Sequence, residues 1–211
     1  APRAIPKPTI RRSDLPGADP GTLDMPGLRK AVATCMGCRL SSGAAASGAL
    51  VGRGSIQPRI LYVTDFAGPA ERACGKVLAP ELGRMMTNMS KALGTPLQEI
   101  YATAAVKCPL PSGAGPSPTE LAACRGYLVR ELELVRPTTI VAFGSLAAKA
   151  LFGPEADFEE LRGRLLTFNE VPTVVTQPPR DMEADPRLKG RAWRELKLLA
   201  PALGLSPDQL P

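Results

Sequence analysis

Four of the five cysteines have the spacing of a metal-ligand set. Cys35 and Cys38 form a C-x2-C pair, and Cys108 and Cys124 follow with fifteen residues between them. Two thiolates on one tight turn chelate well, and two more complete a tetrahedral set. The pattern fits a four-thiolate zinc site or a [4Fe–4S] cluster, with unrelated buried thiols as the alternative. The fifth, Cys74, has no histidine nearby to activate it, so we interpret it as an incidental free thiol.

The amino-acid composition excludes some kinds of catalytic and metal site and favours some kinds of partner. Histidine is absent from the 211 residues, which excludes histidine metal ligands, histidine general bases and Ser/His or Cys/His nucleophile pairs. The formal net charge of +6 suits a polyanionic partner such as DNA, or simply a solubilising surface. No stretch approaches the ~20 apolar residues that a membrane span needs, so we expect no membrane partner and a cytoplasmic location.

Apolar strands and amphipathic helices alternate along the chain and must position these residues. This alternation predicts an α/β fold: a three-layer αβα arrangement around a central, mainly parallel, four-stranded sheet. Ligands in such folds bind at the carboxyl ends of the strands. Strands are predicted at residues 59–63, 100–106 and 138–143, with two shorter ones near 164–168 and 173–176. Helices are predicted over residues 80–93, 117–136, 144–152 and 188–203.

The N-terminal part of the chain differs in composition. Residues 1–20 carry five prolines and no apolar periodicity, which predicts a flexible arm. We expect residues 21–211 to form one domain. A short helix over residues 23–38 would deliver the first cysteine pair, and the Gly/Ala/Ser-rich stretch 41–54 is predicted to be a loop.

Several segments together resemble the iron–sulfur uracil-DNA glycosylases, of family 4 and less closely of family 5. The resemblance runs from about residue 24 to about residue 200. It implies the uracil-DNA glycosylase fold and a [4Fe–4S] cluster on Cys35, Cys38, Cys108 and Cys124, with a structural role or, alternatively, a redox role. The segments that carry it include Cys35–Leu40, Gly75–Met86, Val106–Cys108, Glu120–Leu128, Ile140–Gly144, Leu161–Gly163 and Pro186–Lys189.

The first catalytic motif of the family is altered here. Uracil excision needs an extruded base in a pocket and groups that steady the leaving base. Asp65 falls on the family's glutamate and Glu71 on a later acidic position, so the resemblance implies that a carboxylate could hold a water. Phe66 and Gly68 are expected beside the base. Leu78 stands where the family has a stacking phenylalanine, and a leucine covers a base without π-stacking.

The second and third motifs lack the family's amide and imidazole. Ala104 stands where the family reads uracil with an asparagine. Pro178 stands at the family's histidine, followed by Pro179 at its proline. Gln177 could donate a hydrogen bond to an oxyanion, although it cannot donate a proton as an imidazolium does. Losing several groups, each worth ~3 kcal/mol in the transition state, would leave little activity.

Contact with DNA is expected from the C-terminal third. The resemblance places an apolar wedge after the third motif, where only Met182 is apolar among charged neighbours. The basic residues Arg180, Arg187, Lys189 and Arg191 are predicted to face phosphates, with a solvated helix face as the alternative for the residues from Arg187 onwards.

Three functions follow as hypotheses. The first is a catalytically degenerate glycosylase-fold protein that binds DNA or a protein partner in DNA replication or repair. The second is an active DNA glycosylase with a rebuilt pocket that uses Asp65, Glu71 and Gln177 on uracil or another deaminated base. The third is an iron–sulfur structural subunit of a larger assembly.

Overall fold

The structure is a computed structural model that describes residues 20–41, 48–110, 115–206, 208 and 210–211. The arm predicted over residues 1–20 lies outside these ranges except for Pro20, which is buried in the 3-10 helix Pro20–Thr22. No helix in the described ranges is long and apolar enough to cross a membrane.

A six-stranded sheet forms the centre of the fold, in the order β1-β3-β2-β4-β6-β5. Its four inner strands are parallel, and β1 and β5 pair antiparallel at the two edges. The predicted α/β class is confirmed, whereas the predicted total of four strands is wrong. The strands are β1 (Arg53–Gly54), β2 (Ile60–Phe66), β3 (Ile100–Val106), β4 (Thr139–Phe143), β5 (Leu165–Phe168) and β6 (Val171–Thr176).

The two edge strands, of which the sequence predicts β5 but not β1, have simple physical origins. Strand β1 has only two residues, and its pairing with β3 falls within the stretch predicted to be a loop. Strand β5 forms a hairpin with β6, whose turn places Asn169 and Glu170 at φ values of 44° and 67°. Positive φ at both central positions matches the right-handed twist of paired strands.

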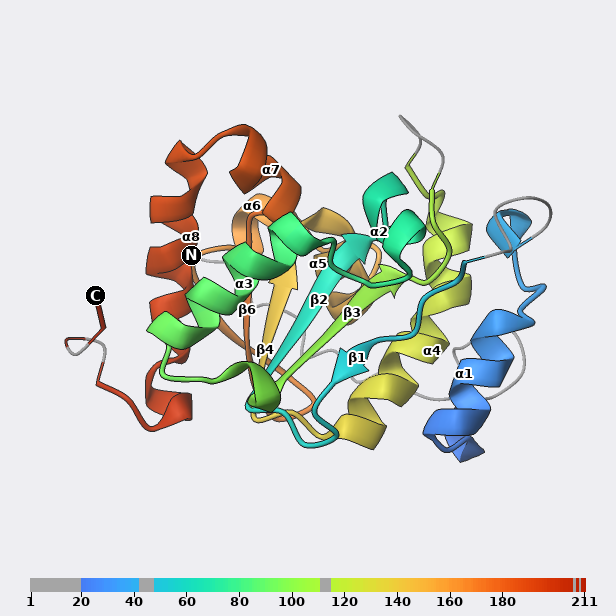
Figure 1. The fold of residues 1–211 in the computed structure, drawn as a ribbon, viewed down its shortest axis with the longest axis horizontal. Coiled ribbons are helices and arrows are strands. Elements are labelled where there is room, and N and C mark those ends of the chain that lie inside the picture. The colour runs from blue at the N-terminus through green and yellow to red at the C-terminus, as the bar shows by residue number, and fades with distance from the viewer. Residues whose placement is uncertain (1–19, 42–47, 111–114, 207, 209) are drawn as a thin grey trace.

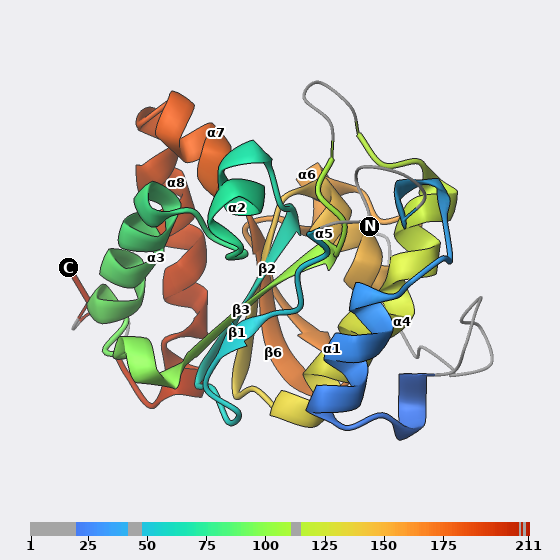
Figure 2. The same cartoon turned by 45° about the vertical axis from the view of Figure 1, so that its right-hand side comes forward.

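Helices cover both faces of the sheet, which gives the predicted three layers (Figures 1 and 2). Side chains alternate between the faces along β2: Leu61 and Val63 belong to one core, and Ile60 and Tyr62 to the other. The first core is covered by α4 (Pro118–Val135) and α5 (Ser145–Phe152), with α1 (Met25–Ala33) against α4. The second is covered by α3 (Pro80–Ala92), α7 (Pro179–Ala184) and α8 (Arg187–Leu196).

Helix α4 begins at the capping box that the sequence predicts. The Ser117 hydroxyl accepts a hydrogen bond from the Glu120 N–H at 3.2 Å, and the Glu120 carboxylate accepts one from the Ser117 N–H at 2.7 Å. Glu120 also pairs with Arg39 at 3.0 Å, which ties the segment after the first cysteine pair to α4. The helix predicted over residues 23–38 is shorter than expected, because α1 ends at Ala33, before both cysteines.

A buried ion pair joins β3 to α4. Lys107 and Glu131 are both buried, and the Lys107 ammonium donates to the Glu131 carboxylate. The same carboxylate accepts hydrogen bonds from the Gly52 N–H at 2.6 Å, the Tyr101 hydroxyl at 3.0 Å and the Thr103 hydroxyl at 2.6 Å. Because buried charges are costly unless they are fully paired, this network fixes the approach of β1, β3 and α4.

Candidate functional site

A pocket of about 330 Å³ opens at the carboxyl ends of β2, β4 and β6. This is the edge at which ligands bind in open parallel sheets. The polar side chains Asp65 and Gln177 line it. Its apolar walls are Phe66, Val77, Leu78, Leu82 and Phe158.

Asp65 is held at the start of α5. Its Oδ1 atom accepts a hydrogen bond from the Ala147 N–H at 2.8 Å. Gly144 lies directly beside the carboxylate, since a Cβ there would stand 2.3 Å from the Asp65 Oδ2 atom. Burial raises the Asp65 pKa to about 7, against the opposing effect of the Ala147 and Leu146 N–H groups. Near neutral pH this carboxyl is therefore able both to accept and to donate a proton.

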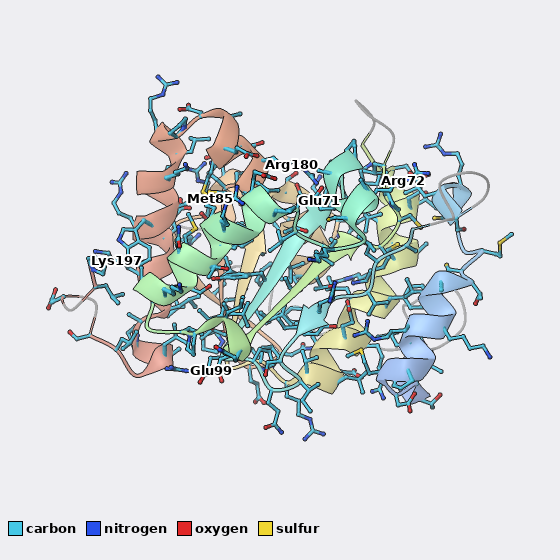
Figure 3. The ribbon with its side chains drawn as sticks, in the orientation of Figure 1. Glu71, Arg72, Met85, Glu99, Arg180 and Lys197 are labelled. Atoms are coloured by element: carbon cyan, nitrogen blue, oxygen red, sulfur yellow. The ribbon has the colours of Figure 1, made fainter. Side chains whose placement is uncertain are left out.

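Glu71 is buried and fully bonded. Its Oε2 atom accepts hydrogen bonds from the Gly68 N–H at 2.8 Å and from the Arg180 guanidinium at 2.6 Å, and its Oε1 atom accepts one from the Ala79 N–H at 3.2 Å. Burial by itself would raise the Glu71 pKa, but Arg180 and the N–H groups of Gly68 and Ala79 lower it overall. Both carboxylate oxygens thus accept hydrogen bonds, and the bond from Arg180 joins α2 (Pro69–Cys74) to α7 (Figure 3).

The Arg180 side chain lines the pocket, where it contacts Glu71 and Phe66. Its guanidinium carbon is 4.9 Å from the centre of the Phe66 ring, a cation–π contact. A Cβ at Gly68 would stand 2.7 Å from the Arg180 Nη2 atom, so the glycine permits this approach. The Arg180 side chain remains 38% exposed, so that an anion at the pocket mouth can still reach it.

Of the other residues that the sequence places in the pocket, some line it and one does not. Leu78 and Gln177 line the pocket, as does Pro178. Gln177 is 8% exposed, and its amide makes no hydrogen bond to another described residue. Ala104 is fully buried within β3 and is absent from the pocket lining, while its carbonyl accepts a hydrogen bond from Lys107 at 2.8 Å. The residue at the position of the family's asparagine is therefore part of the core and does not reach the pocket.

Met182 cannot act as an apolar wedge. It is fully buried in the core beneath α3 and α8, so its side chain is not available for insertion into duplex DNA. The loop expected after the third motif is helix α7, and its amphipathic winding turns Met182 inwards.

Of the predicted basic residues, Arg180 lines the pocket, whereas Arg187, Lys189 and Arg191 are exposed on α8 and do not line it. Arg187 pairs with Asp185 at 2.8 Å, and Arg191 lies 3.6 Å from the Glu195 carboxylate. Lys189 is exposed and pairs with no carboxylate among the described residues. Phosphate binding by α8 stays a prediction.

The four candidate cluster cysteines lie near one another. Cys108 and Cys124 are buried, while Cys35 and Cys38 are half-buried. Burial, together with the nearby thiols of Cys124, Cys38 and Cys35, raises the pKa of Cys108 to about 12. The Cys35 sulfur accepts a hydrogen bond from the Gly37 N–H at 3.4 Å. The fifth cysteine, Cys74, is exposed on α2.

The four thiols provide a soft donor set. No group of three or more His, Cys, Asp or Glu side chains among the described residues is arranged to hold a metal ion. Thiolate donors suit zinc as well as iron–sulfur clusters.

Several site features carry no local signal in the sequence. Phe158 reaches the pocket from α6 (Phe158–Leu161), far along the chain from the motif loops. The contacts of Arg180 with Glu71 and Phe66 likewise depend on how α7 packs. Asp157, which caps α6 through the Glu160 N–H at 2.9 Å, is the one recognisable helix-start signal near Phe158.

The fold and pocket agree with a known superfamily. The family model described as the uracil DNA glycosylase superfamily matches residues 51–197, a range that holds all six strands and the entire pocket. The chain therefore belongs to the uracil DNA glycosylase superfamily.

The curated relatives include Type-4 and Type-5 uracil-DNA glycosylases. The chain is 34% identical over 101 residues to a Type-4 uracil-DNA glycosylase of Archaeoglobus fulgidus, covering 48% of this chain and 51% of that protein. A Type-4 uracil-DNA glycosylase of Pyrobaculum aerophilum matches at 24% identity over 184 residues, 83% of this chain and 93% of the relative. A Type-5 uracil-DNA glycosylase of the same organism is 39% identical over 64 residues, 30% of this chain and 28% of the relative.

These matches confirm the resemblance to families 4 and 5. The chain spans only about half the length of the Archaeoglobus fulgidus relative that it matches.

Proposed function

We propose that this protein binds DNA and holds an extruded base in the pocket, while excising uracil far more slowly than its relatives. The observation that carries this proposal is a preserved pocket whose expected reactive positions are filled by Leu78, Ala104 and Pro178. Of these, Leu78 and Pro178 line the pocket and Ala104 is packed into the core.

The remaining walls support base binding. Phe66, Leu78 and Phe158 offer apolar surface on which a planar base can pack. The Gln177 amide carries both a donor and an acceptor and has no partner among the described residues. It is thus free to hydrogen-bond the edge of a base. The side chains present in the pocket are therefore sufficient to hold a base.

The chemistry of excision is less well supported. Removing one preorganised donor from an oxyanion site costs about a hundredfold or more in rate. Neither an imidazole nor an asparagine amide is present at the family positions, and Glu71 is occupied by Arg180 and backbone N–H groups. A water-positioning role for Glu71 would require it to give up one of these bonds.

We further propose that Cys35, Cys38, Cys108 and Cys124 hold a [4Fe–4S] cluster. Its support is the soft donor set, the mutual influence of the thiols and the Gly37 N–H directed at the Cys35 sulfur. Such clusters supply electron transfer in some proteins. The four cysteines come from three separate parts of the chain, so the ligation would fasten the segment after α1 to β3 and α4.

The decisive test measures binding and abasic-site formation together, on anaerobically purified protein. The substrate is single-stranded DNA carrying one uracil, compared with the same strand carrying thymine. We expect binding with little or no abasic product. Product formation at the rate of a Type-4 relative would overturn the catalytic part of the proposal, and absence of binding at low salt would overturn the whole.

The raised pKa of Asp65 favours a second candidate, an active glycosylase with altered base specificity. A pocket carboxyl with a pKa of about 7 suits general acid–base catalysis at neutral pH. The test is a panel of oligonucleotides carrying deaminated bases, with Asp65→Asn as the inactive control. Excision of any base that Asp65→Asn abolishes would establish this activity, and a panel without abasic product would remove it.

A further inference from the structure

A second concave site lies beside the base pocket. It is a groove of about 720 Å³ between α3 and the β1 edge of the sheet. Its floor is apolar and includes the half-buried Leu78 and Ala102 and the exposed Leu97. Figure 1 looks onto this side, with α3 and β1 flanking β2 and β3. The groove therefore follows the sheet face away from the strand ends at which the base pocket opens.

The charge of the groove is one-sided. Arg53, Lys76, Arg84 and Lys91 line it, and no aspartate or glutamate does so. All four cations are exposed. Arg84 pairs with Glu81 at 3.3 Å, whereas the other three form no ion pair with a described residue. The groove therefore carries a net positive charge above an apolar floor. This combination is complementary to an anionic chain with apolar groups, such as a nucleic-acid strand.

The groove adjoins the base pocket. Val77 and Leu78 line both cavities, and Lys76 stands next to them at the junction. From there the groove follows α3 as far as Lys91, a distance of about 17 Å at 1.5 Å per residue from Pro80. A strand whose base enters the pocket could therefore continue directly along this path.

We propose that this groove binds single-stranded DNA next to the extruded base, an inference that rests on the proposed DNA binding. Phosphates would lie along Lys76, Arg84 and Lys91, with Arg53 on the opposite wall. The apolar floor would receive the faces of the bases, a sequence-tolerant contact. A groove of this volume admits one extended strand and is too small for a double helix. DNA already single-stranded would thus be preferred over duplex.

Two groove residues far from the base pocket allow a selective test. Lys91 and Arg53 line the groove but not the pocket, and both are exposed. The variants are Lys91→Glu and Arg53→Glu. The matched control is Lys149→Glu, because Lys149 is also an exposed lysine in the last turn of a helix, on the other side of the sheet.

The measurement is the anisotropy of a fluorescein-labelled oligodeoxythymidine, titrated with the full-length chain over a series of salt concentrations. Each lost phosphate contact should lower the slope of log affinity against log salt by about 0.7, roughly a fivefold weaker affinity at about 0.1 M salt. Lys91→Glu and Arg53→Glu should each show this loss while Lys149→Glu does not. Thermal melting should be unchanged in all three variants, since every substituted side chain is exposed.

The outcomes separate this inference from the proposed function. If the unmodified chain fails to bind single-stranded DNA at low salt, both ideas fall. If it binds and both groove variants match Lys149→Glu in affinity and slope, only the groove assignment is overturned. Polyglutamate serves as the competing anionic polypeptide. Displacement of the DNA by polyglutamate at equal charge concentration would assign the groove to an acidic protein segment and overturn the inference.

Discussion

Arg180 and Glu71 meet at 2.6 Å between Nη2 and Oε2, across 109 positions of sequence. The contact joins α7 to α2 at the mouth of the base pocket and positions the guanidinium over Phe66. The carboxylate that the family resemblance assigns to chemistry accepts hydrogen bonds here from Arg180 and from the Gly68 and Ala79 N–H groups.

Removing the charge of Glu71 should destabilise the contact between α2 and α7 at the pocket mouth. Glu71→Gln should lower the free energy of unfolding by about 1–3 kcal/mol, since Arg180 loses its charged partner. The control is Glu81→Gln, whose exposed pair with Arg84 should be worth well under about 1 kcal/mol. Urea unfolding measures both. Equal midpoints for the two variants would contradict the structural role.

The same pair predicts a loss of stability in acid. The folded-state pKa of Glu71 is lower than its unfolded value, so its contribution is complete above the ordinary glutamate pKa of about 4.3. The contribution disappears as pH falls through the lower, folded-state pKa. Wild type and Glu71→Gln should therefore converge in stability in strong acid. A constant difference down to the lowest pH would contradict this prediction.

Asp65 should behave in the opposite way. Its folded-state pKa of about 7 lies above the unfolded value of about 3.9, so the folded state binds more protons between these limits. Stability must fall as pH rises from about 4 to about 7. Asp65→Asn keeps an acceptor for the Ala147 N–H and should remove this decline.

The control for Asp65 is Asp157→Asn. Asp157 also accepts a hydrogen bond from an N–H at a helix start, but it is exposed. Thermal melting across this pH range gives the comparison. If Asp65→Asn leaves the slope of stability against pH unchanged, the carboxyl is not desolvated as the structure indicates.

The cysteine set makes a compositional prediction. Cys124→Ser should lower the iron and sulfide content of anaerobically purified protein, together with its melting temperature, because one of four ligands is lost. Cys74→Ser should leave both unchanged, since Cys74 is exposed and lies outside the set. Zinc in place of iron in the unmodified protein would show that the cluster assignment is wrong.

Restoring an imidazole should raise uracil excision. Pro178 lines the pocket with φ −58°, a conformation open to other residues, so Pro178→His would direct an imidazole at the leaving base. We expect at least about a tenfold increase in abasic product. Pro178→Ala, which removes the ring without adding a proton donor, is the control. Equal rates for the two variants would argue against loss of the histidine as the cause of weak catalysis.

Breaking the buried Lys107–Glu131 pair should be more damaging than any surface change. Lys107→Met leaves the Glu131 carboxylate buried without its counterion, which costs about 3–5 kcal/mol. Arg84→Met removes an exposed partner of Glu81 and should cost less than about 1 kcal/mol. Chemical denaturation distinguishes the two, and a mild effect of Lys107→Met would contradict the network described for β3 and α4.

The sequence by itself determined the features that rest on short-range patterns. Apolar periodicity predicted the alternation of strands and helices, because a side chain's face follows from its position in a strand or helix. The Ser117–Glu120 capping box was readable because its atoms are three residues apart. The spacing of Cys35 and Cys38 likewise indicated a shared turn. The short edge strand β1 escaped prediction, since two residues carry no period.

Only the tertiary structure decided what the candidate site residues do. Met182, in a charged segment, is buried because α7 turns it into the core, and Ala104 is withdrawn from the pocket by its place inside β3. The basic groove likewise combines cations from β1, the loop before α3 and α3 itself. These roles depend on the packing of elements far apart in the chain. A local sequence pattern predicts where a helix or strand forms. Which elements pack against it is decided by the burial of apolar side chains in the whole core.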